Sequence, residues 1–116
     1  MEKRTGGCHC GAVRYEVEID LSQPVIDCNC SYCQRKGALL SFIPGDKLVV
    51  TAGEDNLSEY RFNSQQIQHL FCKTCGTQCF GRGPGKDGPG AAINVRTIDD
   101  VDMEALTRMP FDGKSR

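Results

Sequence analysis

Eight cysteines, seven of them in three short clusters, constrain the fold of this 116-residue chain more than any other feature. Two clusters are pairs, in Cys8-His9-Cys10 and Cys72-Lys73-Thr74-Cys75, and the third holds three cysteines between positions 28 and 33. Sulfurs this close together serve one metal ion better than they serve each other as disulfides. The first ten residues, MEKRTGGCHC, contain no apolar run that could act as a secretory signal. We therefore expect a cytoplasmic metal-binding protein rather than a disulfide-rich secreted one.

Each of the two cysteine pairs is followed directly by a glycine. In a metal knuckle the chain folds back so that its amides point at the sulfurs, and the residue after the second ligand often needs a positive φ, which glycine adopts freely. Alternate residues of an extended segment face the same side, so Cys8 and Cys10 can approach one ion. The two-residue spacer between Cys72 and Cys75 fits a tight turn. The two pairs together predict a closed structural zinc site with four cysteine ligands.

The middle cluster, Cys28, Cys30 and Cys33, offers three sulfurs, and no glycine follows its last cysteine. Three protein ligands and one exchangeable position are typical of catalytic zinc, whereas structural sites are closed. We therefore expect a second zinc ion here, with an open position for a thiol, and two zinc ions per chain. Two alternatives remain for the eighth cysteine: Cys79 closes this site as a fourth ligand, or it is a buried small side chain.

The rest of the sequence predicts a mainly β fold. Apolar and charged residues alternate from Val13 to Ile19, which is typical of a half-buried strand. Turn signals at 44–46, 53–56 and 63–64 favour antiparallel hairpins, and hence an open barrel or folded sheet. We expect one domain over residues 1–116, a small zinc-stabilised antiparallel β fold with little helix. Further strands are predicted at 25–28, 39–43, 48–51, 59–62, 69–71 and 92–95.

Two late segments fit no strand pattern. Residues 81–90 contain five glycines and two prolines, which predicts an irregular loop. This loop is either a tolerated surface insertion or a lid whose Arg82 and Lys86 meet an anionic ligand. Apolar residues between Ile98 and Met109 have helix-compatible spacing, with aspartates near the amino end, so we expect one or two helical turns there.

Charge and hydropathy exclude some kinds of partner. Lys and Arg number 14 against 15 for Asp and Glu, which gives a net charge of −1, and the basic residues form no stripe. Nucleic acid is therefore not an expected partner. The longest apolar runs fall far short of the roughly 20 residues that cross a bilayer, so no membrane partner is expected either. The sequence leaves the oligomeric state open.

Four segments resemble the glutathione-dependent formaldehyde-activating family, which is related to centromere-protein-V-like domains: GGCHCGAVRYEV, DCNCSYCQRKG, FCKTCGTQCF and INVRTID. The resemblance spans nearly the whole chain and implies a β-rich zinc fold of the β-tent, zinc-ribbon-like kind. The sequence departs from the family at Cys79, where similar proteins usually carry an apolar residue. The resemblance implies that Cys28, Cys30 and Cys33 hold a catalytic ion, and that the structural ion is held by Cys8, Cys10, Cys72 and Cys75.

The resemblance also implies an activity, the condensation of formaldehyde with glutathione to S-hydroxymethylglutathione by a carbon–sulfur lyase. Zinc coordination would deprotonate a thiol with a pKa of about 8.5 and so prepare it to attack a small aldehyde. Arg35, Lys36 and Arg96 are candidates to bind the carboxylates of the thiol substrate, although each could equally be an ordinary surface charge. Two other functions stay open: a zinc-stabilised protein-interaction module with two closed sites, and a zinc- or redox-handling protein that uses Cys79.

Overall fold

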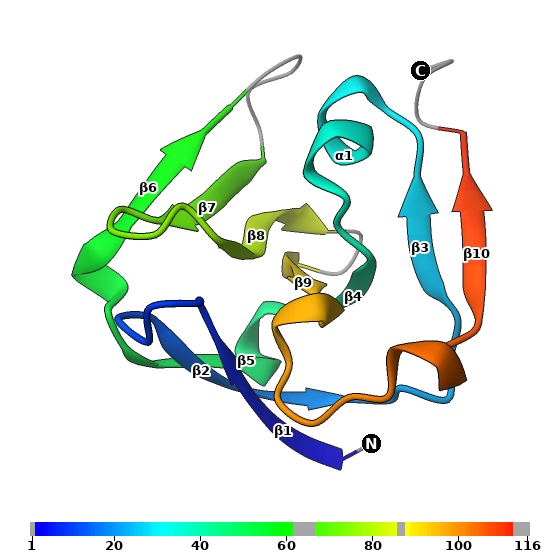
Figure 1. Cartoon of the computed structure of the whole chain (residues 1–116), viewed down its shortest axis with the longest axis horizontal. Helices are drawn as coiled ribbons and strands as arrows, with labels where there is room; N and C mark the ends of the chain where they lie inside the picture. The colour runs from blue at the N-terminus through cyan, green and yellow to red at the C-terminus, as the bar shows by residue number, and fades with distance from the viewer. Residues whose placement is uncertain (1, 62–66, 86–87, 113–116) are drawn as a thin grey trace.

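Strands dominate the computed structural model, which describes residues 2–61, 67–85 and 88–112 (Figure 1). One antiparallel sheet has the order β1 (Glu2–Gly7), β2 (Arg14–Ile19) and β5 (Leu48–Ala52). In the larger sheet only β10 and β3 pair in parallel, among the pairings of the described residues. The prediction of a mainly β fold with antiparallel sheets is confirmed. The larger sheet has the order β10 (Arg108–Phe111), β3 (Val25–Cys28), β4 (Leu40–Pro44), β9 (Gly88–Asn94), β8 (Gln78–Gly85), β7 (Gln68–Cys72) and β6 (Leu57–Tyr60).

The helical elements are short. The single α-helix of the described residues, α1 (Ser31–Lys36), begins after Cys30, whose sulfur accepts a hydrogen bond from the amide of Cys33, and ends at Gly37 with a φ of 69°. In Figure 1, α1 lies between the β6–β8 part of the larger sheet and the β3–β10 pair. Four 3₁₀ turns complete the described chain: η1 (Gly45–Lys47), η2 (Glu54–Asn56), η3 (Val95–Thr97) and η4 (Met103–Ala105).

The hydrophobic core combines residues of both sheets. The alternation predicted for β2 buries Tyr15, Val17 and Ile19, each about 1% exposed. The ring of Tyr15 meets the ring of Phe80 from β8 edge to face, with centroids 5.7 Å apart and planes at 85°. Such a pair adds roughly 0.5–1.5 kcal/mol to the effect of burial. One shared core therefore joins the two sheets.

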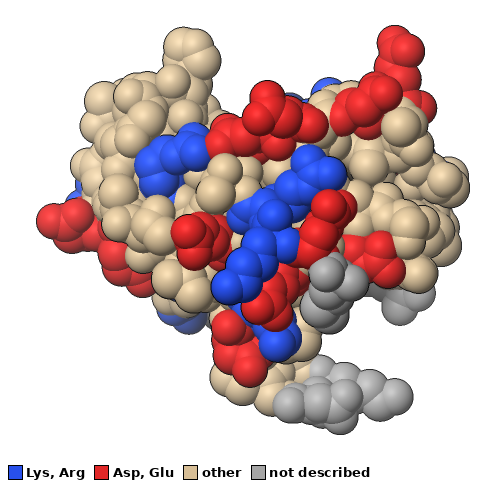
Figure 2. All heavy atoms as spheres, turned by 90° about the horizontal axis from the view of Figure 1, so that it is seen from below, with Lys and Arg blue, Asp and Glu red and all other residues tan. Residues whose placement is uncertain are grey.

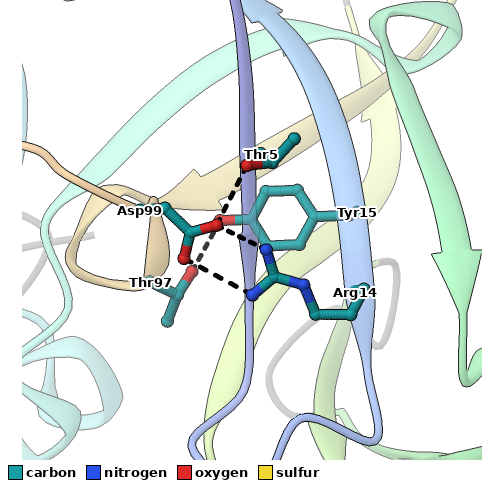
Figure 3. A network of polar contacts seen from close by, with 5 residues as sticks. All are labelled: Thr5, Arg14, Tyr15, Thr97 and Asp99. Carbon is teal, nitrogen blue, oxygen red and sulfur yellow. Dashed lines mark hydrogen bonds and ion pairs between the residues drawn. The ribbon is translucent and has the colours of Figure 1, made fainter.

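The buried hydroxyl of Tyr15 has a polar partner beyond the core. It lies 2.7 Å from Thr97 Oγ1, and Thr97 Oγ1 in turn donates to the backbone oxygen of Asn94 at 2.7 Å. Burial raises the pKa of Tyr15, so the phenol stays protonated and can donate. The smaller sheet is thereby tied to the 3₁₀ turn η3 that follows β9 (Figure 3).

A second set of contacts holds the chain after η3 against the smaller sheet. Figure 3 shows the guanidinium of Arg14 paired with the carboxylate of Asp99, which also accepts a hydrogen bond of 2.9 Å from Thr5 Oγ1. The bond from Arg14 lowers the pKa of Asp99. Asp99 is therefore an ion-pair partner, whereas the sequence predicted an acidic residue near the start of a helix.

The predicted helical turns between Ile98 and Met109 are only partly present. The structure has one 3₁₀ turn, η4, in which the side chain of Asp102 accepts the amide of Glu104 at 3.1 Å. Met109 then lies in β10, which pairs with β3. The helix-like spacing was misleading because the last part of the segment forms β10, whose pairing with the distant strand β3 outweighs local propensity.

The prediction of an irregular loop over residues 81–90 is wrong for the residues that the structure describes. The ends of β8 and β9 continue as an antiparallel ladder through Gly83↔Gly90, Pro84↔Pro89 and Gly85↔Gly88. Glycine suits this hairpin because a Cβ on Gly85 would lie 2.7 Å from the carbonyl oxygen of Gly88. Arg82 forms an ion pair with Glu54 at 2.8 Å, and Lys86 lies outside the described residues.

Two of the predicted hairpin turns instead connect the two sheets. The first turn signal forms η1 between β4 and β5, and the second forms η2 between β5 and β6, so each joins strands of different sheets. The third signal, at 63–64, lies outside the described residues. Turn residues specify a change of direction, but they do not determine which strand the chain pairs with afterwards.

Charged side chains of both signs are interleaved on the face seen in Figure 2. Ion pairs within the smaller sheet and at its border include Arg4 with Glu2 at 3.2 Å and Lys47 with Glu18 at 3.1 Å. Among the described residues, no helix has both the length and the apolar character needed to cross a membrane.

Gly53 provides a test of how the strand connections pack. Its φ is +81°, and an added Cβ would lie 2.2 Å from the carbonyl oxygen of Ala12. We expect Gly53→Ala to lower the free energy of unfolding by about 2–4 kcal/mol, since a left-handed conformation and a backbone clash both oppose the methyl group. Gly37→Ala is the matched control: its φ is +69°, but nothing lies within 4 Å of the added Cβ, so about 1 kcal/mol is expected. Urea unfolding in excess zinc measures both, and equal losses would contradict the packing argument.

Candidate metal centres

Four cysteines from distant parts of the chain meet in one group. Cys8 and Cys10 lie in the connection after β1, Cys72 ends β7, and Cys75 lies in the turn that leads to β8. Their sulfurs all lie within 4.8 Å of one another. The sulfur of Cys10 is 3.6 Å from that of Cys8 and 3.7 Å from that of Cys72, which is 62 positions away in sequence. We call these residues the four-cysteine group, and they could hold a metal ion.

Backbone amides point at these sulfurs, as expected for metal knuckles. The amide of Val13 donates to Cys8 Sγ at 3.3 Å, and the amide of Thr74 donates to Cys72 Sγ at 3.4 Å. The two glycines that follow the pairs have φ values of 83° and 81°, so the predicted positive φ is confirmed at both. The similar geometry of the two knuckles explains why their sequences share a pattern.

Hydrogen bonds and crowding act in opposite directions on these thiols. A hydrogen bond with the Thr77 side chain, then one with its amide, lowers the pKa of Cys75 to about 5, and the amide of Cys75 lowers the pKa of Cys72. The Ala12 amide acts to lower the pKa of Cys10, but desolvation and the adjacent thiols outweigh it and raise that pKa to about 11. Neighbouring thiolates repel each other, so a cation is needed to ionise all four together.

The second group, Cys28, Cys30 and Cys33, forms where β3 ends and α1 begins; we call it the three-cysteine group. Its sulfurs also lie within 4.8 Å of one another, and it could hold a metal ion as well. The amide of Cys30 donates to Cys28 Sγ at 3.5 Å, and the amide of Cys33 donates to Cys30 Sγ at 3.3 Å. Burial raises the pKa of Cys33. No other histidine, cysteine or carboxylate among the described residues joins this group.

The side chain of Tyr32 fixes α1, and with it the three-cysteine group, to the larger sheet. Its hydroxyl donates to Gln78 Oε1 at 2.9 Å, and the backbone oxygen of the buried Gln78 accepts from Asn94 Nδ2 at 2.9 Å. The ring of Tyr32 stacks on Tyr60, with centroids 5.5 Å apart and planes at 19°, and lies 4.4 Å from His69. No pattern in the sequence predicted this anchor, although the polar Gln78, two residues before Phe80, was a possible signal.

The three cationic candidates gather at the carboxyl end of α1. Arg35 donates to the backbone oxygen of Ser31 at 3.0 Å, and Arg96 Nε donates to the backbone oxygen of Gly37 at 2.9 Å. The ammonium of Lys36 lies 5.5 Å from the ring centroid of Phe71 and 5.8 Å from that of Tyr32. Arg35 and Lys36 thus lie in α1, as Cys33 does, and Arg96 contacts Gly37 at the end of this helix. The binding of carboxylates by these three residues remains a prediction.

Cys79 belongs to neither group. It is about 1% exposed, and burial raises its pKa to about 12, with smaller contributions from Cys8, Cys75 and Cys72 and an opposing one from Thr97. It belongs to the same core cluster as Cys8 and Cys72, and it is not grouped with Cys28, Cys30 and Cys33, the site that it was a candidate to close. The histidines also join neither group: His9 is exposed, and burial and then Lys36 lower the pKa of His69.

The fold and the two cysteine groups define a class of small, mainly β proteins with one four-cysteine and one three-cysteine site for metal ions. A sequence profile of the glutathione-dependent formaldehyde-activating enzyme matches residues 3–110, and the chain belongs to this family. Within the matched region, the structure brings together two cysteine pairs that are far apart in the sequence.

One curated protein and one solved structure are similar to this chain. A Talaromyces marneffei protein named "Putative glutathione-dependent formaldehyde-activating enzyme" is 37% identical over 82 residues, which are 65% of this chain and 42% of that protein. The match thus covers less than half the length of that relative. A crystal structure of a Rhodobacter sphaeroides protein, a structural genomics target, superposes with a TM-score of 0.79 at 32% identity and covers 91% of this chain and 97% of its own.

The two groups are expected to contribute differently to stability. Cys75→Ser should greatly reduce soluble, folded protein, because a structural metal site can supply on the order of 10 kcal/mol to the folding of a small domain. Cys33→Ser should leave most of the fold intact, since the three-cysteine group comes from one short stretch at the end of β3 and the start of α1. Far-ultraviolet circular dichroism and bound metal per chain measure the difference. Equal stability of the two variants would overturn this division of roles.

Cys79 provides a separate test of the open position. Cys79→Ala should keep the full metal content and lower the free energy of unfolding by only about 1 kcal/mol, the cost of a small cavity in the core. Metal analysis of the purified variant, with urea unfolding, measures both quantities. Loss of one metal ion per chain would show that Cys79 is a ligand and that the three-cysteine site is closed.

Proposed function

We propose that this chain is a zinc-dependent carbon–sulfur lyase that adds glutathione, or a similar thiol, to formaldehyde or another small aldehyde. The observation that carries the proposal is the three-cysteine group, which no fourth histidine, cysteine or carboxylate of the described residues completes. Zinc with three protein ligands keeps a position for substrate. The family to which the chain belongs, and the name of the Talaromyces relative, supply the candidate substrates.

The donor sets fit zinc, and we propose two ions per chain. Thiolates are soft ligands that favour zinc among the common divalent ions, and a Zn–S distance near 2.3 Å in a tetrahedron places sulfurs about 3.8 Å apart. The sulfur separations of 3.6 and 3.7 Å in the four-cysteine group are close to this value. Cys8, Cys10, Cys72 and Cys75 would hold the structural ion. Cys28, Cys30 and Cys33 would hold the catalytic one.

The protein's own residues would hold the metal ligands in place and orient the thiol substrate. When bound, zinc supplies the chemistry that turns a neutral thiol into a thiolate near neutral pH. The amide of Cys33 holds the sulfur of Cys30 in place, and Tyr32 keeps α1 against the sheet. Lys36 and its neighbours Arg35 and Arg96 would orient the thiol substrate through its carboxylates.

Two further properties belong to the same proposal. A single core that includes both sheets supports one domain over residues 1–116. None of the eight cysteines is paired in a disulfide, and free thiols persist in a reducing compartment, which supports the cytoplasm as the site of action. The alternative function, an interaction module with two closed metal sites, needs a fourth ligand at the three-cysteine group.

Cobalt replacement tests the proposal directly. Glutathione or another cognate thiol should increase thiolate-to-metal charge-transfer absorption in the cobalt protein, because one more sulfur joins the three-cysteine site, and binding should release protons. With zinc restored, thiol and formaldehyde should form their adduct faster than without enzyme. Cys33→Ser should lose both responses and Cys79→Ala should keep both. An unchanged spectrum with a panel of thiols, together with no acceleration, would favour the interaction module.

A further inference from the structure

The larger sheet has one face in the core and one face outside it. Residues paired across neighbouring strands point to the same face, and the face alternates along each strand. Phe80 pairs with Ile93, and both are buried in the core, so their immediate neighbours in sequence, Gly81 and Ala92, lie on the opposite face. Ala92 pairs with Phe42 in β4, so Phe42 lies on this non-core face. Gly81 pairs with His69 in β7, and His69 pairs with Tyr60 in β6, so the non-core face reaches Tyr60 on the other side of the sheet.

The non-core face includes the three-cysteine group. Cys28 and Ile26 alternate with the buried Val25, so both lie on this face at the end of β3. Phe111 pairs with Cys28, Met109 pairs with Ile26, and Leu40 pairs with Ile26 from the other side. Four apolar side chains therefore lie on the same face of the sheet as Cys28, in its own and the adjacent strands. We call Ile26, Leu40, Met109 and Phe111 the apolar strip.

Most of the large exposed apolar residues of the described chain lie on this face. Of the six large apolar residues that are exposed there, four belong to this face: Phe42 at 66%, Tyr60 at 49%, Met109 at 47% and Phe111 at 37%. Of these four, Met109 and Phe111 pair with the strand that carries Cys28. Exposed apolar side chains that gather at one place on a protein surface often mark a binding site. The position of the apolar strip beside Cys28 points to a ligand that also reaches the three-cysteine group.

Charge is divided between the two sides of the three-cysteine group. Among the described residues of β3, β4 and β10, those on the non-core face include no Lys, Arg, Asp or Glu. The cations lie on the α1 side, where the ammonium of Lys36 is 5.5 Å from the ring centroid of Phe71. An anionic thiol fits the cationic side, and an uncharged apolar reactant fits the strip.

We propose that the apolar strip binds the hydrocarbon group of the aldehyde, so that this enzyme acts on aldehydes that are larger and more apolar than formaldehyde. The inference rests on the proposed function and names the substrate class of the same site. In the reaction the carbon–sulfur bond forms as the carbonyl π bond breaks, and the proton of the thiol ends on the carbonyl oxygen. Formaldehyde has no hydrocarbon group to bury, whereas a phenyl or alkyl group gains free energy from leaving water.

The first experiment measures binding without chemistry. Benzyl alcohol, which resembles benzaldehyde but cannot react with a thiol, is titrated into the zinc-loaded protein and followed by NMR. Met109→Ala and Phe111→Ala should each weaken its binding about tenfold, the effect of removing one good apolar contact. Val49→Ala is the matched control, because Val49 is 54% exposed but lies in β5 of the other sheet. Benzyl alcohol that does not bind, or binding that all three variants leave unchanged, overturns the inference.

The second experiment measures selectivity. The ratio of kcat/KM for benzaldehyde to kcat/KM for formaldehyde, with one thiol, should exceed one and should fall about tenfold in Met109→Ala but not in Val49→Ala. A ratio below one that Met109→Ala leaves unchanged overturns the inference and leaves the lyase proposal standing.

If no thiol and aldehyde pair is accelerated, the lyase proposal fails, and the benzyl alcohol titration still decides whether the strip binds an apolar ligand. If the strip is instead buried between copies of the chain, Met109→Ala should dissociate an oligomer in sedimentation without affecting benzyl alcohol, which also overturns the inference.

Discussion

The meeting of four thiols from two hairpins is the constraint on which the rest of the structure depends. Cys8 and Cys10 lie in the turn between β1 and β2 of the smaller sheet. Cys72 ends β7 of the larger sheet, and Cys75 lies in the turn that leads to β8. Their sulfurs approach within 4.8 Å, although unshielded thiolates at this distance repel each other. A zinc ion, as we propose, would turn this repulsion into a cross-link between the two sheets. The buried Tyr15, at the edge of Phe80, packs the same two sheets together.

The three-cysteine group depends on local contacts rather than on the meeting of two sheets. Its three sulfurs come from one short stretch, so local backbone bonds such as that from the amide of Cys33 to Cys30 Sγ are enough to arrange them. Its position in the molecule depends on α1, which Tyr32 ties to β8 through Gln78. The site can therefore be close to solvent while its supporting helix stays fixed to the sheet. One group thus joins the two sheets and the other is local and partly exposed, which is consistent with the structural and catalytic roles that we propose for them.

The surroundings of the three-cysteine group have two chemical sides. Lys36 with its aromatic neighbours lies on the α1 side, and the apolar strip lies on the β3 and β10 side. Such a division would suit the reaction that we propose, because an anionic thiol and an uncharged aldehyde would each meet a side of matching chemistry. The chain of pairings from β10 through β3 to β4 creates the apolar side, and the single α-helix of the described residues creates the charged one.

The sequence alone was enough for features that depend on residues close together in the chain. The alternation from Val13 to Ile19 identified β2, because a strand with one buried face must alternate. The two glycine-flanked cysteine pairs indicated knuckles with positive φ, because local backbone geometry requires it. Grouping the two pairs together was also correct as geometry, since their shared pattern pointed to one common site.

Tertiary structure decided what depends on pairing between distant segments. It made a hairpin of the glycine-rich stretch after residue 80, because β7 and β4 flank it and hydrogen bonds across the ladder outweigh weak local propensity. Asp99, expected near the start of a helix, forms an ion pair with Arg14, and Cys79 lies in the same core cluster as Cys8 and Cys72. Tertiary structure also brought Phe111 opposite Cys28 through the parallel β10–β3 pairing. No local pattern encodes such contacts, because they follow from how the whole sheet closes around its core.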